Sequence, residues 1–194
     1  MSNIALQQPV VVWDRRGKEI INGKVVTMAP ARPAHQMAIY RISRIFGNYL
    51  EGKPCKVLFD VYVHLTNKNK VAPDISIVCN PDIIKEDGIH GAPDLVIEVL
   101  SSSTAARDRL EKKKIYEEFG IGEYWIVDVK NRVIEVYSLT DSKYELRNIY
   151  TIYDEFDAME MTQEEKAGIV TEFKTSLFDD LIIDIREIFK DSMD

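Results

Sequence analysis

The chain has 194 residues, 45% of them hydrophobic and 29% charged, which is typical of a globular protein long enough to bury a substantial core. We therefore expect a single domain over residues 1–194. The formal net charge of −7 argues against indiscriminate binding to nucleic acid. Residues 154–194 hold 13 acidic and 4 basic side chains, which leaves 19 acidic and 21 basic ones, a net charge of +2, in residues 1–153. The overall acidity therefore says little about what the first part of the chain binds.

Targeting signals and cysteines bear on the compartment. No run of about 18 apolar residues is present, and the N-terminus lacks a basic segment followed by a long apolar one. We therefore expect a cytoplasmic protein without a membrane segment. Cys55 and Cys79 lie in apolar, strand-like stretches, and we interpret them as buried free thiols in a reducing cytosol, in preference to a disulfide. The absence of CxxC and HExxH motifs argues against a structural or catalytic zinc site.

Hydrophobic periodicity and turn residues predict the elements of the first part of the chain. Asn22-Gly23 between apolar pairs suits a type I′ hairpin turn, and Gly52 marks the end of an amphipathic helix. The expected elements are, in order, a hairpin over 19–26, a helix over 34–50, a strand over 55–65, a turn at 67–70 and a strand over 72–80.

A Pro-, Asp- and Gly-rich loop over 80–93 separates this part from the second. The elements expected after it are a strand over 94–101, a helix over 104–119, strands over 123–128, 133–139, 143–152 and 168–173, and a terminal amphipathic helix within 176–189. This order predicts an α/β (α+β) fold in which a mixed central β-sheet is flanked by helices.

Four carboxylates lie within or beside the apolar strands: Asp60, Asp74, Asp94 and Glu98. A carboxylate in a strand that is apolar on both faces is costly unless it is paired or bound to a metal. If the strands of Asp74 and Glu98 pair antiparallel across the 80–93 loop, the two carboxylates can bind one divalent cation, and oxygen ligands favour Mg²⁺ or Mn²⁺. The alternative for Glu98 is a buried salt bridge with a nearby lysine.

The other two carboxylates are weaker candidates. Asp94 and Glu98 point to the same face but lie roughly 13 Å apart along one strand, so they cannot share an ion directly. We therefore assign Asp94 a capping or turn role. Asp60 is a weak third candidate, because the sequence does not fix its register.

The helix after the Glu98 strand carries the next group of candidates. Asp108, Lys112 and Tyr116 are spaced four apart and line one helix face, from which Lys112 can reach the end of that strand. The alternative is a solvated face on which Asp108 and Lys112 form an ion pair. A basic patch beside them suits a phosphate backbone, although such charge runs are usually solvated. It comprises Arg107, Arg109, Lys113 and Lys114.

Five stretches together resemble the Uma2 family, a branch of the PD-(D/E)xK nuclease superfamily with a restriction-endonuclease-like fold. They are INGKVVTMAP followed by HQ, APDISIVC, GAPDLVIEVLS, RDRLEKKKIYEEFGIGEYWIVD and SLFDDLIIDIREIF, and they span residues 19 to 190 approximately. The combination of PDLVIEVLS, the D-x3-K-x3-Y helix and EYWIVD is specific, whereas each alone is weak.

The resemblance implies which residues form the site. Asp74 corresponds to the aspartate of the superfamily motif and Glu98 to its second acidic residue. The chain departs from the pattern at Leu100, where the superfamily has lysine, and Lys112 stands where Uma2-like chains have theirs. His35 matches a histidine common in the family, with a polar contact at the helix start as the alternative role.

The resemblance therefore implies an endonuclease that hydrolyses DNA phosphodiester bonds with Mg²⁺ or Mn²⁺ as cofactor. Asp74 and Glu98 would hold the metal, Lys112 would act on water or phosphate, and Tyr116 would buttress Lys112. A homodimer is expected by analogy with restriction-like cores.

Two further readings stay open. The alternative function is a catalytically silent nuclease-fold protein that serves as a binding or assembly module. The acidic C-terminal region and the lack of a DNA-reading module favour it. Action on RNA, or on branched or modified DNA, also remains open.

Overall fold

The computed structural model describes residues 17–28 and 31–190. The main sheet contains six strands, and β9 and β10 are parallel while the other neighbours are antiparallel. The strands, in spatial order, are β12 (Lys143–Thr151), β11 (Val133–Thr140), β10 (Glu123–Asp128), β9 (Leu95–Val99), β6 (Ile75–Val78) and β3 (Lys56–Phe59). The prediction of a mixed central sheet is therefore confirmed.

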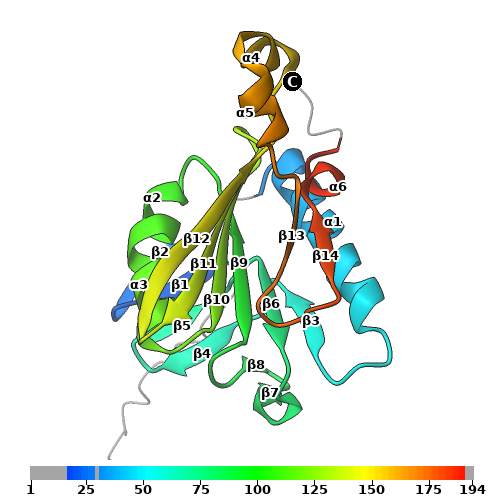
Figure 1. Cartoon of the computed structure of the whole chain (residues 1–194). Coiled ribbons are helices and arrows are strands. Elements are labelled where there is room, and N and C mark those ends of the chain that lie inside the picture. Colours follow the sequence, from blue (N-terminus) through cyan, green and yellow to red (C-terminus); the bar gives the residue numbers. More distant parts are fainter. Residues whose placement is uncertain (1–16, 29–30, 191–194) are drawn as a thin grey trace, which may run out of the picture.

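One face of this sheet packs against α1 (Pro33–Leu50) and the C-terminal elements (Figure 1). Apolar residues spaced three and four apart put Ile39, Ile42 and Phe46 on the buried side of α1, where Phe46 packs against Trp125 of β10. The C-terminal elements are β13 (Glu172–Lys174), β14 (Ile182–Asp184) and α6 (Ile185–Phe189). The expected terminal helix is thus shorter than predicted, because β14 takes up the residues before it.

The opposite face carries the second core and a second sheet, whose strands are mostly shorter. Their spatial order is β2 (Lys24–Thr27), β1 (Lys18–Ile21), β5 (Asn69–Val71), β4 (Val63–Thr66), β8 (Gly88–Ile89) and β7 (Ile84–Lys85). The helical segments on this side are α2 (Ala105–Arg107), the π-helix η2 (Asp108–Lys112) and α3 (Lys113–Glu118). Ile115 and Tyr116 of α3 pack into this second core.

The remaining helical segments lie outside these two layers. They are the 3₁₀ turn η1 (Pro81–Ile83), α4 (Glu155–Glu160) and α5 (Gln163–Ala167). Figure 1 shows α4 and α5 projecting from the end of the sheet opposite β7 and β8. Among the described residues, no helix is both long and apolar enough to cross a membrane. Residues 1–16, where we expect no signal peptide, lie outside the described ranges.

Two expectations about residues 55–79 were wrong. The strand expected over 55–65 is broken, because Asp60 adopts a positive φ of 54° and turns the chain from β3 in the main sheet to β4 in the second. Cys55 and Cys79 are joined in a disulfide instead of being free thiols. Lys56 pairs with Val78 on antiparallel strands, so the two cysteines are the next cross-strand pair and lie directly opposite each other.

Candidate active site

Asp74 and Glu98 lie opposite each other on the neighbouring strands β6 and β9. Ile75 pairs with Ile97 in the antiparallel register, so Asp74 and Glu98 occupy the next opposed positions. The predicted pairing is therefore confirmed, while a metal-binding role for the pair stays a prediction. Asp74 Oδ2 accepts a 2.7 Å hydrogen bond from the Val99 amide.

Glu98 is buried, with 3% of its surface exposed, and the helix after its strand supplies its partners. Its Oε1 accepts hydrogen bonds from Lys112 Nζ at 3.0 Å and from the Tyr116 hydroxyl at 2.6 Å. Burial raises the pKa of Glu98 well above its usual value, and the positive charge of Lys112 opposes that rise. Tyr116 was predicted to support Lys112. In the structure its hydroxyl instead holds Glu98.

Lys112 is the centre of a buried ionic cluster. Its Nζ lies 2.8 Å from Glu19 Oε1, 3.0 Å from Glu98 Oε1 and 3.7 Å from Asp108 Oδ1. Burial acts to lower the pKa of Lys112, but the three carboxylates outweigh it and hold this pKa above its usual value. The alternative of a solvated face is wrong, because Asp108 and Lys112 are both buried.

The local winding of the helix brings these side chains together. Residues 108–112 form a π-helical turn, in which the Lys113 amide bonds to the Asp108 carbonyl. The helix predicted over 104–119 is therefore α2, η2 and α3 in succession. Such turns are uncommon and occur often at functional sites. Here the wider turn contains both Asp108 and Lys112, the two residues that close the cluster around Glu98.

Glu19 belongs to this cluster but was not predicted. It is 1% exposed, and its Oε1 accepts a 2.9 Å hydrogen bond from the Ala72 amide in addition to its contact with Lys112. The strand pattern contains a signal for it, because Glu19 and Ile21 alternate onto the same buried face of β1. A carboxylate that shares a face with a core isoleucine needs a buried partner.

The other two strand carboxylates lie apart from the cluster. Asp94 Oδ2 accepts a 2.7 Å hydrogen bond from the Cys79 amide, which confirms its capping role. Asp60 is exposed and forms the turn between β3 and β4, where it contributes its backbone conformation.

His35 lies at the start of α1 and faces Asp74. Its Nε2 is 3.4 Å from Asp74 Oδ2. Burial alone would lower the pKa of His35, but the hydrogen bond and the charge of Asp74 raise it above the usual value. His35 therefore contacts a predicted site residue, and its role in the site stays a prediction.

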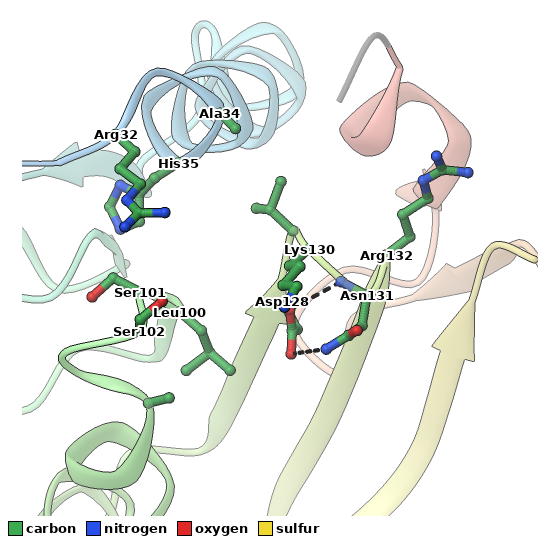
Figure 2. Close-up of a pocket in the computed structure, with 12 residues that line it drawn as sticks. Arg32, Ala34, His35, Leu100, Ser101, Ser102, Asp128, Lys130, Asn131 and Arg132 are labelled. Atoms are coloured by element: carbon green, nitrogen blue, oxygen red, sulfur yellow. Dashed lines mark hydrogen bonds between the residues drawn. The ribbon is translucent and has the colours of Figure 1, made fainter. Parts of the chain in front are cut away.

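A cleft of about 490 Å³ lies beside His35. Figure 2 shows Arg32 and His35 on one side of it, facing Asp128, Lys130 and Asn131 on the other. The further lining residues are Ala34, Leu100, Ser101, Ser102, Ala105, Val129 and Arg132. Three lining residues are arginine or lysine and one is acidic, so the lining favours an anionic occupant.

The predicted basic patch on the helix is partly engaged within the protein. Arg109 forms a 2.8 Å ion pair with Glu135, and Lys113 Nζ lies 3.7 Å from the centre of the Tyr137 ring. Arg107 is half-buried on the preceding turn. A nucleic-acid contact by Arg107, Arg109 or Lys113 remains a prediction, and the cleft holds a separate set of basic residues.

Comparison with known proteins identifies the family of this chain. The model of the Uma2 family, described as "Putative restriction endonuclease", matches residues 14–167, and the chain belongs to this family. The predicted family and fold are confirmed. An "Uncharacterized protein slr1290" of Synechocystis sp. is 30% identical over 135 residues, which cover 66% of this chain and 71% of that protein.

A solved structure supports the fold. A crystal structure from Anabaena variabilis, described as "a putative nuclease belonging to DUF820", superposes with a TM-score of 0.67 over 89% of each chain. The two sequences are 17% identical, so the likeness concerns the fold. The site of the present chain must therefore be judged from its own residues.

Proposed function

We propose that this protein is a Mg²⁺-dependent endonuclease that hydrolyses phosphodiester bonds in DNA. The observation that carries the proposal is an excess of buried carboxyl groups over lysine. Glu19, Glu98 and Asp108 are each at most 3% exposed, and Asp74 adjoins them, yet within residues 17–28 and 31–190 Lys112 is the one lysine among them. Buried carboxylates in excess of their cationic partners are costly, and a divalent cation would offset that cost.

The donor atoms suit a hard cation. Asp74, Glu98 and Asp108 offer carboxylate oxygens, which Mg²⁺ and Mn²⁺ prefer. Within the described part of the chain, Asp108 Oδ1 is buried without a hydrogen-bond partner. Asp74 and Glu98 would hold the metal, which would supply Lewis-acid stabilisation of the phosphate and a nucleophilic water when bound.

Neighbouring residues of the chain would stabilise the phosphate charge and orient the two carboxylates. Lys112 stays protonated because its pKa is raised, so it serves as a hydrogen-bond donor to developing phosphate charge rather than as a base. Tyr116 orients Glu98 through its 2.6 Å hydrogen bond, and His35 positions Asp74. The arrangement supports phosphoryl chemistry beside His35, which lines the cleft and contacts Asp74.

The cleft supports a nucleic acid as substrate. Arg32, Lys130 and Arg132 line it and would contact backbone phosphates on either side of the scissile bond. DNA is the proposed substrate because the family to which the chain belongs is described as "Putative restriction endonuclease". RNA and branched DNA are the comparisons to include in any assay.

The proposal is tested by cleavage of supercoiled plasmid, linear DNA and RNA with Mg²⁺, with EDTA as the blank. The matched pair is Glu98→Gln, which replaces the buried carboxylate on β9, and Glu111→Gln, which replaces an exposed one on the π-helical turn that carries Lys112. We expect wild type and Glu111→Gln to nick the plasmid, and Glu98→Gln to be inactive but folded. Equal cleavage by all three proteins would contradict the site.

One observation favours the silent binding module as a second candidate. Lys112 already lies 3.0 Å from Glu98, so this carboxylate has a charged partner without any metal. In that case Mg²⁺ binds weakly or not at all, and no nucleic acid is cut. Retained DNA binding without cleavage, unchanged by EDTA, is the result that selects this function.

We also propose a homodimer in the cytoplasm. Phe156 and Met159 of α4 are 81% and 75% exposed, which supports an apolar contact between copies. Light scattering on a sizing column decides the oligomeric state. The Cys55–Cys79 disulfide is uncommon for the cytoplasm, so the redox state of the protein in cells tests the compartment.

A further inference from the structure

A second group of side chains that could bind a metal lies on β4 and around the β7–β8 hairpin of the second sheet, outside the carboxylate cluster. His64, Asp87 and His90 each offer one ligand atom, and these atoms all lie within 4.8 Å of one another. They include two of the three histidines of the chain. Figure 1 shows β7 and β8, which carry this edge, at the end of the molecule opposite α4 and α5.

Strand register brings the two imidazoles together. Val63 of β4 pairs in parallel with Ile89 of β8, and both are fully buried. The residues that follow, His64 on β4 and His90 directly after β8, therefore point to the opposite face and lie side by side. Their rings stack with centroids 4.5 Å apart and an interplanar angle of 19°.

The β7–β8 turn adds the carboxylate. Asp87 Oδ1 lies 2.8 Å from His90 Nε2, and Asp87 Oδ2 lies 3.9 Å from His64 Nε2. Gly88 permits this approach, because its φ is +139° and a Cβ there would lie 2.4 Å from the Tyr62 carbonyl oxygen and 3.1 Å from the His64 ring. The backbone is thus shaped to bring the turn against His64.

We propose that His64, Asp87 and His90 form a binding site for a divalent transition metal of the zinc class. A tetrahedral zinc ion with bonds of about 2.0–2.1 Å holds its ligand atoms roughly 3.4 Å apart. The three ligand atoms all lie within 4.8 Å of one another, and Asp87 Oδ1 lies 2.8 Å from His90 Nε2, so small side-chain movements would bring them to that spacing. Three protein ligands leave a fourth position for water, and Asp87 and His90 are 44% and 45% exposed, which gives the ion access from solvent.

This site differs in chemistry from the carboxylate cluster. Imidazole nitrogens favour zinc, cobalt, nickel and copper, whereas Mg²⁺ prefers oxygen atoms alone. The ligands come from β4, the β7–β8 turn and the residue after β8. A search for CxxC and HExxH motifs therefore could not detect this site. Bound metal would fasten the β7–β8 hairpin to β4 independently of any nuclease activity.

The test is calorimetric titration of Zn²⁺ into the protein without reductant, so that Cys55 and Cys79 stay in their disulfide and do not compete for metal. The main variants are Asp87→Asn and His90→Gln, whose side chains are too exposed for folding to depend on them. The matched control is Glu86→Gln, an exposed carboxylate beside Asp87. The Asp74→Asn, Glu98→Gln double variant separates the two sites.

We expect one Zn²⁺ bound at these three residues in the wild-type chain, and a loss of affinity for this ion of at least about tenfold in Asp87→Asn and His90→Gln. Glu86→Gln and the double variant should bind as wild type does. Co²⁺ should give visible absorption bands of a tetrahedral site in wild type that disappear in His90→Gln. No binding by wild type, equal binding by the His90→Gln variant, or binding that disappears in the Asp74→Asn, Glu98→Gln variant alone would overturn the proposal.

Discussion

Asp74 and Glu98 occupy opposed positions on β6 and β9, yet their surroundings differ. Asp74 is held by the Val99 amide and by His35, which lines the cleft. Glu98 is turned toward Lys112 and Tyr116 in the interior. One carboxylate thus lies beside the cleft and the other in the buried ionic cluster, and a cation between them would join the two environments.

Replacement of Lys112 by methionine tests the balance of charge in the cluster. The variant leaves Glu19, Glu98 and Asp108 buried without their cation, which should lower the free energy of unfolding by about 3–5 kcal/mol. Urea denaturation measures the loss. Lys114→Met is the control, because Lys114 is exposed on the same helix and its replacement should change stability by no more than about 0.5 kcal/mol. Similar stabilities for the two variants would show that Lys112 is not needed to offset the carboxylates.

Tyr116→Phe tests whether this hydroxyl positions Glu98. Loss of a hydrogen bond to a carboxylate should cost about 1.5–3 kcal/mol of stability. Tyr144→Phe is the matched control, because its hydroxyl donates to the Ile121 carbonyl away from the cluster and its removal should cost about 0.5–1.5 kcal/mol. A nuclease assay should show a lower kcat for Tyr116→Phe alone. Unchanged kcat in both variants would leave Tyr116 with a structural role only.

The Cys55–Cys79 disulfide predicts how the chain reacts with a thiol reagent and how reduction changes the free energy of unfolding. The unfolded, unreduced chain should give no reaction with a thiol reagent, and reduction should release two thiols. Because the bridge closes a loop with a sequence separation of 24, its reduction should lower the free energy of unfolding by about 3–4 kcal/mol. Two reactive thiols before reduction would return Cys55 and Cys79 to the free state first expected for them.

The basic lining of the cleft predicts a salt-dependent affinity for DNA. Arg32→Ala and Lys130→Ala should each weaken binding, and the slope of log K against log salt concentration should fall by about 0.9 for each phosphate that the variant no longer neutralises. Lys24→Ala, which replaces an exposed lysine on β2, is the control. Fluorescence anisotropy at several salt concentrations gives both quantities. Identical slopes in all variants would place the DNA elsewhere on the molecule.

The parts of the site that the sequence predicted correctly depend on short-range patterns. Asp74 and Glu98 lie opposite each other because the two strands, which follow each other within the main sheet, pair antiparallel. Asp108, Lys112 and Tyr116 lie together because helical spacing survives the π-helical turn. These relationships need only strand alternation and helical periodicity.

The parts that were missed depend on long-range contacts or on single backbone angles. Glu19 reaches Lys112 from a hairpin 93 positions earlier in the chain, and no periodicity within either segment connects them. The break at Asp60 needs a positive φ in an otherwise continuous apolar run. The disulfide follows from the register of β3 and β6. This register was not predicted, because the pattern of residues 55–65 indicates one unbroken strand.

The central claim, that Asp74 and Glu98 hold a divalent cation, is tested most directly by isothermal titration of Mg²⁺. Wild type and the Asp74→Asn, Glu98→Gln double variant are compared, with circular dichroism to confirm that both are folded. We expect Mg²⁺ binding to wild type and its loss in the double variant. Equal binding by the two proteins, or none by either, would contradict the metal site and return Glu98 to a structural salt bridge with Lys112.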